Sequence, residues 1–324
     1  YEHDVVVGTV TPITIRLLDS ANNPVDNKNP AATHTISLYT SGDGGSGFVQ
    51  GSDYVQDLSL PTNAAGAVPV NLRVSTVSGP NTFQVYPIGS YLGEPVIING
   101  VADSNPSYLT QNTIYPESYP ADGKDPDHRF TFYYTVQDKY KNPMKDVSLH
   151  VTSSNGEEVY LITDSGGMNF THYGPKDIAG VYTITATPVI AGTTTPLNHA
   201  ILCTGTLESG FCRQTVEYTS MDPVDMILTA SPQTMVSMDV TGAKALEVRA
   251  KVVDIAGNGV KDQTVTFEKS DDSFSPFTET AQSSLSATSL TTGDTGYGTV
   301  SFIPGTFAKK GQTGYNDAAT GSCK

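Results

Sequence analysis

The sequence predicts an all-β protein built from three tandem β-sandwiches. One observation behind this prediction is a segment that occurs three times, as "LLDSANNPVDN" at 17–27, "VQDKYKNPMKDVSLHV" at 136–151 and "VVDIAGNGVKDQTVTF" at 252–267. The aspartates of these segments are Asp19, Asp138 and Asp254, and they lie 119 and 116 residues apart. That period is the length of one domain rather than of one supersecondary unit.

Composition is the second observation. The chain has 30 Gly, 20 Pro, 17 Tyr and no Trp, and short runs rich in Thr and Val alternate with turn residues, without any long stretch of helical period. The net charge of −15, with only 18 Lys and Arg in 324 residues, argues against a nucleic acid partner. No run of 18 apolar residues occurs, so no transmembrane helix is expected. The chain begins at Tyr1 without a recognisable signal peptide, and a secreted or surface location must therefore be inferred indirectly.

Each repeated aspartate ends a segment in which alternate residues are apolar. Such a period of two predicts a strand with one face in the core and one face in water. The inward positions lie six, four and two residues before the aspartate, and they are Ile13, Ile15 and Leu17 in the first copy, Phe132, Tyr134 and Val136 in the second, and Val248, Ala250 and Val252 in the third.

A tight turn and a second alternating segment follow each aspartate. The turn residues are Asn23-Pro24, Asn142-Pro143 and Asn258-Gly259, which favour turn conformations. An apolar residue then returns at Val25, Met144 and Val260. The next strand has inward pairs Ile36 and Leu38, Leu149 and Val151, and Val265 and Phe267, with about six extra residues, 27–32, in the first copy. Further on, Gly66, Gly180 and Gly296 are expected to open corresponding strands.

About seven short strands in each stretch of roughly 100 residues is the spacing of an immunoglobulin-like sandwich. The predicted domains are 1–103, 104–220 and 221–324. The first domain is about ten residues short in its opening strand, and the third stops at Lys324, where a final strand should begin. Either the sequence is a piece of a longer chain, or strands are supplied between subunits.

The repeated segment resembles bacterial immunoglobulin-like domains of the invasin/intimin type. The resemblance rests on the aspartate turn and on the "TxxxG" entry to a later strand. It also rests on "ILTASPQTM" at 227–235, which is similar to an opening strand, and on "PADGKDPDHRFTFYYTVQD" at 120–138. The resemblance implies the sandwich fold and a place on a microbial or phage surface. It implies no catalytic residues.

One acidic segment is a candidate metal site. Asp122, Asp125 and Asp127 of "DGKDPD" offer three carboxylates to a hard cation such as Ca²⁺. The alternative is an acidic turn without an ion, and no other cofactor is predicted.

Three further residues or pairs are candidates for covalent modification. Cys203 and Cys212 flank "TGTLESGF", so we expect a disulfide across a hairpin, with two separate thiols as the alternative. Such a bond fits an oxidising, extracellular setting. Cys323 is left over, which indicates an intermolecular partner or one outside the sequence. Asn169 begins an Asn-Phe-Thr acceptor sequence for glycosylation, although the match can be a chance one.

The sequence predicts no enzyme. The Gly-rich run at 42–47 precedes no helix and no P-loop lysine, no Gly-x-Ser-x-Gly nucleophile motif occurs, and the histidines form no metal-binding pair. We therefore expect an extracellular structural protein, a rod, filament or surface-layer subunit that self-associates into a fibre or layer. The alternatives are a cell-surface adhesin or glycan-binding module, and accessory domains of a secreted enzyme.

Overall fold

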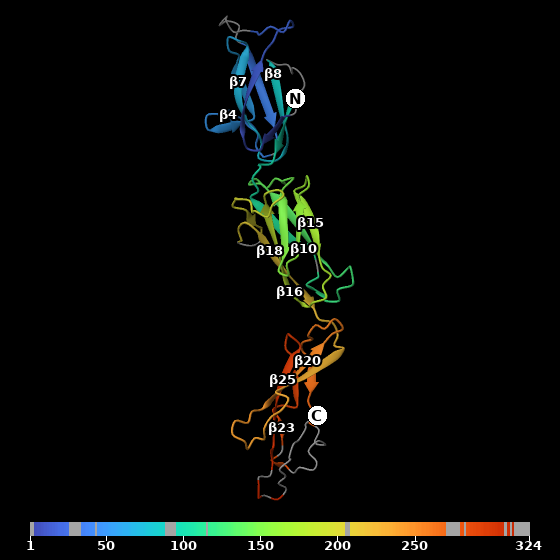
Figure 1. Ribbon diagram of the computed structural model, residues 1–324. Coiled ribbons are helices and arrows are strands. Elements are labelled where there is room, and N and C mark those ends of the chain that lie inside the picture. Colours follow the sequence, from blue (N-terminus) through green and yellow to red (C-terminus); the bar gives the residue numbers. More distant parts are fainter. Residues whose placement is uncertain are drawn as a thin grey trace. The chain divides into compact units, whose positions relative to one another are not determined.

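The computed structural model describes residues 3–25, 34–42, 44–87, 95–114, 116–204, 208–269, 279–281, 283–307, 310–311 and 313. Regular secondary structure in these ranges consists of β-strands, which confirms the all-β prediction (Figure 1). No helix within these ranges has the length and apolar character needed to cross a membrane. The chain divides into two compact units. One comprises Tyr1–Ile114, Thr131–Thr171 and Thr183–Gln214, and the other comprises Tyr115–Phe130, His172–Tyr182 and Thr215–Lys324.

Strands of the first repeat form two sheets, with the orders β1-β9-β8-β3-β6 and β2-β7-β4-β5. β1 runs parallel to β9, and the other described pairings are antiparallel. The strands are β1 (His3–Val6), β2 (Val10–Arg16), β3 (Thr35–Ser41), β4 (Gly47–Gln50), β5 (Asp53–Val55), β6 (Asp57–Pro61), β7 (Ala67–Arg73), β8 (Gly79–Pro87) and β9 (Val96–Val101).

Strands of the second repeat form sheets with the orders β15-β12-β10-β17 and β11-β18-β16-β13-β14. They are β10 (Tyr108–Ile114), β11 (Ser118–Pro120), β12 (Phe130–Gln137), β13 (Ser148–Ser153), β14 (Glu158–Ile162), β15 (Met168–Tyr173), β16 (Gly180–Val189), β17 (Leu202–Cys203) and β18 (Cys212–Thr219).

Strands of the third repeat form a four-stranded sheet, β19-β20-β25-β23, and two ribbons, β21-β24 and β22-β26. They are β19 (Asp225–Ser231), β20 (Leu246–Val253), β21 (Thr264–Thr266), β22 (Glu279–Ala281), β23 (Ser284–Leu285), β24 (Ser289–Thr291), β25 (Tyr297–Ile303) and β26 (Thr306–Phe307). Among the described strands, no sheet combines two of the predicted domains. The boundaries after 103 and 220 stay a prediction.

The repeated aspartate builds its turn with its own side chain. In the second repeat, Asp138 Oδ1 accepts hydrogen bonds from the backbone N–H groups of Tyr140 (2.8 Å) and Asn142 (2.9 Å). Asp19 and Asp254 make the same pair of bonds, so the motif is a local device for reversing the chain. The third residue after each aspartate has a positive φ, at Asn22, Lys141 and Gly257.

The glycine prediction was wrong for the second repeat. Gly167, not Gly180, is the counterpart of Gly66 and Gly296, because each of these three directly precedes a strand that neighbours the aspartate strand. A Cβ atom on Gly167 would lie 2.7 Å from the backbone N of Met144, and the φ of Gly167 is +69°. The position therefore requires glycine.

Most of the predicted inward residues are buried in the cores of the sandwiches. The half-buried ones pack against these cores and are Ile13 and Ile15 in β2, Leu17 directly after it, and Val248 in β20. Phe132, Tyr134 and Val136 are fully buried, and so is Ala250. Ile15 packs against the first core but remains half-buried. Its strand, β2, lies at the end of its sheet, which explains the exposure.

Candidate functional site

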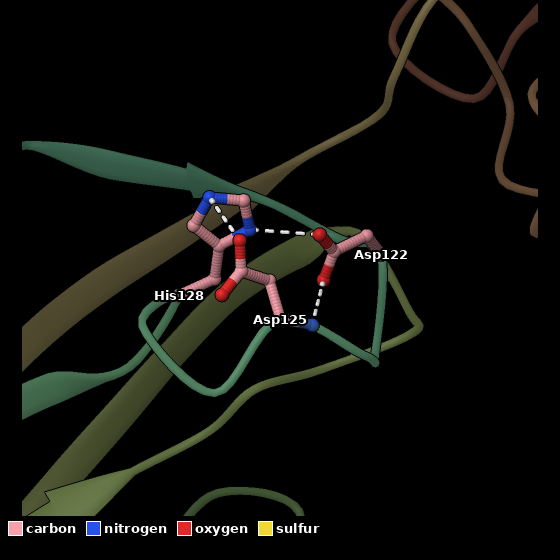
Figure 2. Close-up of side chains that lie close together, drawn as sticks. All are labelled: Asp122, Asp125 and His128. Atoms are coloured by element: carbon pink, nitrogen blue, oxygen red, sulfur yellow. Dashed lines mark hydrogen bonds and ion pairs between the residues drawn. The ribbon is translucent and has the colours of Figure 1, made fainter.

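A loop between β11 and β12 holds the cluster that the sequence singled out for metal binding (Figure 2). Ligand atoms of Asp122, Asp125 and His128 lie within 4.8 Å of one another. Asp127 is exposed and is not part of the group, and its backbone N–H donates to Asp125 Oδ1 at 2.9 Å. The structure thus brings together two of the three predicted carboxylates and adds His128.

Backbone hydrogen bonds give the loop its shape. Asp122 Oδ1 accepts the N–H groups of Lys124 (3.1 Å) and Asp125 (3.3 Å), and the carbonyl of Asp125 accepts the N–H of His128 (3.0 Å). Gly123 has a φ of +63°, its N–H donates to the carbonyl of Lys176 at 2.9 Å, and a Cβ atom there would lie 2.8 Å from Asp177 Cβ. The loop is therefore fixed against the segment that contains Asp177.

The imidazole lies between the two carboxylates. His128 Nδ1 is 2.8 Å from Asp122 Oδ2, and Nε2 is 3.7 Å from Asp125 Oδ2. Partial burial raises the pKa of Asp122, but hydrogen bonds from Lys124, Asp125 and His128 outweigh it, so that the pKa lies below its ordinary value. The ring of Tyr119 packs on the imidazole, with centroids 5.4 Å apart.

Two carboxylates and one imidazole form a donor set that can hold a divalent cation. Imidazole suits Zn²⁺ and other transition metals better than Ca²⁺, which prefers oxygen ligands. A cation would have to replace the hydrogen bond between Asp122 and His128, and without one the two side chains satisfy each other. The Ca²⁺ site at Asp122, Asp125 and Asp127 stays a prediction. The spacing of Asp125 and His128 was the signal that could have indicated the imidazole.

The structure contains the predicted disulfide between Cys203 and Cys212, with Cα atoms 5.2 Å apart. The bond does not close a simple hairpin. Cys203 lies in β17, which pairs with β10, whereas Cys212 begins β18 in the other sheet of the repeat. The disulfide therefore connects the two sheets. Cys323 lies outside the described residues.

The predicted glycosylation residue, Asn169, lies within β15 and is half-buried. Its Nδ2 donates to the carbonyl of Ile162 at 2.6 Å, and its Oδ1 accepts the N–H of Phe170 at 2.7 Å. Both ends of the amide are engaged, and glycosylation at this residue stays a prediction.

Sequence reasoning missed a second role of the repeated turn, which contacts the preceding repeat. Within the first compact unit, Asn142 Nδ2 donates to the carbonyl of Thr76 and Oδ1 accepts the N–H of Ser78, both at 2.8 Å. Asp138 Oδ2 accepts the N–H of Asp103 at 3.1 Å. We call this set of three hydrogen bonds the Asp–Asn clamp.

The same clamp occurs within the second compact unit. Asn258 Nδ2 donates to the carbonyl of Asp177 and Oδ1 accepts the N–H of Ala179, both at 2.9 Å. Asp254 Oδ2 accepts the N–H of Met221 at 3.0 Å. In both clamps the asparagine binds a carbonyl and an N–H two residues apart. The sequence signal was an asparagine four residues after the aspartate in all three copies.

A depression of about 720 Å³ lies next to the first clamp, within the first compact unit. Asn99, Asp103, Pro143, Lys145 and Leu197 are among its lining residues. Lys145 pairs with Asp146 at 3.4 Å, and both side chains are exposed.

Comparisons with known proteins concern structure only, since no protein-family model and no curated protein matches the sequence. One similar solved structure is FdeC, described as an Escherichia coli adhesin, with 16% identity, 98% of this chain and 92% of that chain covered, and a TM-score of 0.45. InvD of Yersinia pseudotuberculosis has 17% identity, coverage of 94% and 78%, and a TM-score of 0.40. Invasin, described as a bacterial integrin-binding protein, has 17% identity, coverage of 91% and 54%, and a TM-score of 0.37. Two-domain structures of intimin are also similar.

Proposed function

We propose that this chain is a non-enzymatic extracellular structural protein, in which tandem immunoglobulin-like sandwiches act as a spacer at a cell surface. The observation that carries the proposal is the Asp–Asn clamp, which occurs twice with the same three hydrogen bonds. Assembly of the chain into a rod, filament or surface layer, by addition of strands between subunits, is the finer form of this proposal.

The clamp suits a protein in which neighbouring repeats must stay attached to each other. Asp138 is fully buried and Asn142 is 4% exposed, so separating the repeats would leave hydrogen-bonding groups to be resolvated. A buried polar group that loses its partner costs about 1–3 kcal/mol. The connections are short, residues 102–107 and 220–224, which limits the freedom of each joint.

Other features support an extracellular location. The disulfide between Cys203 and Cys212 is of the kind that persists in oxidising compartments. A net charge of −15 favours solubility at high density on a surface, because like-charged molecules repel one another.

An adhesive role is the second candidate, and an exposed aromatic pair favours it. Tyr133 and Phe170 lie on neighbouring strands with ring centroids 5.9 Å apart, and Phe170 is 52% exposed. Exposed aromatic side chains of this kind are common in protein and glycan recognition.

Electron microscopy of the purified chain tests the structural role against the adhesive one. We expect extended particles of reproducible length, and end-to-end association at high protein concentration. In parallel, fluorescent chain is titrated onto host cells and glycan arrays. Saturable binding that is lost in Tyr133→Ala/Phe170→Ala, together with particles that show no preferred length, would reject the spacer in favour of an adhesin.

A further inference from the structure

Among the strands that the structure describes, β2 has a free edge that its counterparts lack. In the second repeat β12 lies between β15 and β10, and in the third β20 lies between β19 and β25. β2 stands at the end of the order β2-β7-β4-β5, and no strand in the described part of the chain pairs with its other edge. The counterparts of the missing neighbour are β10 and β19, which both run antiparallel to the aspartate strand.

The hydrogen-bond pattern shows which groups face this edge. The N–H of Leu17 donates to the carbonyl of Gly66, and the carbonyl of Thr9 accepts the N–H of Val74, both at 2.9 Å. Since alternate residues of an antiparallel strand bond to the same neighbour, the backbone groups of Thr14, Arg16 and Leu18 point to the free edge.

The free edge coincides with unusual exposure of the apolar side chains around it. Ile15 is half-buried, whereas its counterparts Tyr134 and Ala250 are fully buried. Leu18 is 44% exposed, and its counterpart Val253 is 6% exposed. An added strand would cover this apolar surface.

The clamp residues of the first repeat are a second, independent sign of a missing partner. Asp19 and Asn23 form the turn but are exposed. The side-chain amide of Asn23 contacts Asp19 Oδ2, at 3.3 Å. In the two other repeats, the same atoms hold a linker N–H and a loop of the preceding sandwich.

In each of the other repeats, one continuous segment both binds the aspartate of the turn and pairs with the edge of the aspartate strand. The linker residue Asp103 bonds to Asp138, and strand β10 begins five residues later. Met221 bonds to Asp254, and β19 begins four residues later. We propose that the free edge of β2 and the turn from Asp19 to Asn23 together bind a linker and strand that follow a further immunoglobulin-like sandwich, N-terminal to Tyr1 in the same polypeptide.

The register follows from the two known cases. Tyr108 pairs with Gln137, one residue before the aspartate, and Ile114 pairs with Thr131. The equivalent strand on β2 would extend from Leu18 to Pro12. Proline on an edge strand normally discourages pairing because it lacks the N–H. Pro12 lies at the last paired position, so it would only end the added strand. Thr14 and Arg16 each have a backbone N–H and a carbonyl with which the added strand can pair.

The test uses the full chain with one addition, a copy of residues 102–115 joined ahead of Tyr1. We expect hydrogen exchange at Thr14, Arg16 and Leu18 to slow by roughly tenfold or more, because these amides gain partners. An extension with proline in place of the residues corresponding to Thr110 and Asn112 is the matched control, and it should give no protection. Equal exchange rates with the normal and the proline extensions would overturn the proposal.

Two further arms test the clamp and the source of the strand. Asp19→Ala should reduce the protection that the extension gives, whereas Asp53→Ala, an exposed aspartate in β5, should not. Sedimentation of the chain without an extension tests the other source. Concentration-dependent association that slows exchange at Thr14 would show that a second copy supplies the strand, and the proposed source in the same polypeptide would then be wrong.

Discussion

At the scale of single residues, Asp254 accepts hydrogen bonds both from its own turn and from the linker that precedes the third repeat. It is 2% exposed and accepts N–H groups from Met221, Ala256 and Asn258. Burial raises the pKa of its carboxyl, but these hydrogen bonds outweigh burial and leave the pKa below its ordinary value. The charged form therefore stabilises the fold.

The first prediction is that Asp254→Asn destabilises the third repeat by about 1–3 kcal/mol at about pH 7. Because the pKa is lower in the folded state, the contribution is present above the unfolded value of about 4 and is lost as the pH falls through the folded value. The stabilities of the variant and the natural protein should thus converge once the pH lies below the folded-state pKa of Asp254, which is itself below the ordinary value. Urea unfolding at several pH values measures this. Asp19→Asn, at the exposed counterpart, is the control and should cost less.

The second prediction concerns the cluster of Asp122, Asp125 and His128. If it holds a cation, adding CaCl₂ or ZnCl₂ should raise the unfolding temperature of the natural protein, because a ligand that binds only the folded state stabilises it. Asp122→Asn should abolish the rise, and Asp127→Asn, outside the cluster, should retain it. An unchanged unfolding temperature with both ions would leave the cluster as a hydrogen-bonded loop.

At the scale of elements, substitution of Gly167, the glycine before β15, can distinguish the cost of a steric clash from the cost of an unfavourable backbone conformation. Gly167 and Gly156 both have a positive φ, but a Cβ atom on Gly167 would lie 2.7 Å from Met144 N, whereas nothing lies within 4 Å of one on Gly156. We expect Gly167→Ala to lower the unfolding midpoint well beyond the loss in Gly156→Ala, which carries only the backbone cost of about 1 kcal/mol. Equal losses in denaturant titrations would contradict the packing argument.

Elements whose signal is local could be predicted from the sequence. The alternation around Tyr134 and Ala250 and the aspartate turns depend on neighbouring residues, and the structure has them where the sequence placed them. The counterpart of Gly66 in the second repeat could not be identified from its distance to the repeated aspartate, because loop lengths differ between the copies. His128 was missed because the loop closes through backbone bonds that no motif records.

The disulfide connects β17 to a strand of the other sheet in the second repeat. The spacing of the two cysteines in the sequence could not show that they lie in different sheets. We predict that Cys203→Ser/Cys212→Ser leaves the second repeat folded but speeds hydrogen exchange in β17 and at Tyr108 and Leu109, which pair with it. A short loop of this kind contributes about 2–3 kcal/mol. Exchange mapping that finds no change at these amides would contradict the link between sheets.

At the scale of the whole molecule, the charge of −15 opposes close approach of chains, whereas the clamps act within the chain. Any end-to-end association should therefore strengthen with ionic strength, since salt screens repulsion between exposed charges more than it weakens buried contacts.

Asn142 offers the most direct test of whether the clamp limits motion between the first and second repeats. Asn142→Ala removes the hydrogen bonds to Thr76 and Ser78 while Asp138 keeps its turn. We predict little change in the unfolding of each sandwich but a wider distribution of molecular dimensions in small-angle X-ray scattering, because the joint loses two of its three bonds. Asn23→Ala in the 324-residue chain is the matched control, because the side-chain amide of Asn23 bonds to Asp19 of its own turn, and its scattering should equal that of the natural protein. If Asn142→Ala scatters like the natural protein as well, the clamp does not set the geometry of the joint. The proposed spacer role would then require other contacts to limit motion between the repeats.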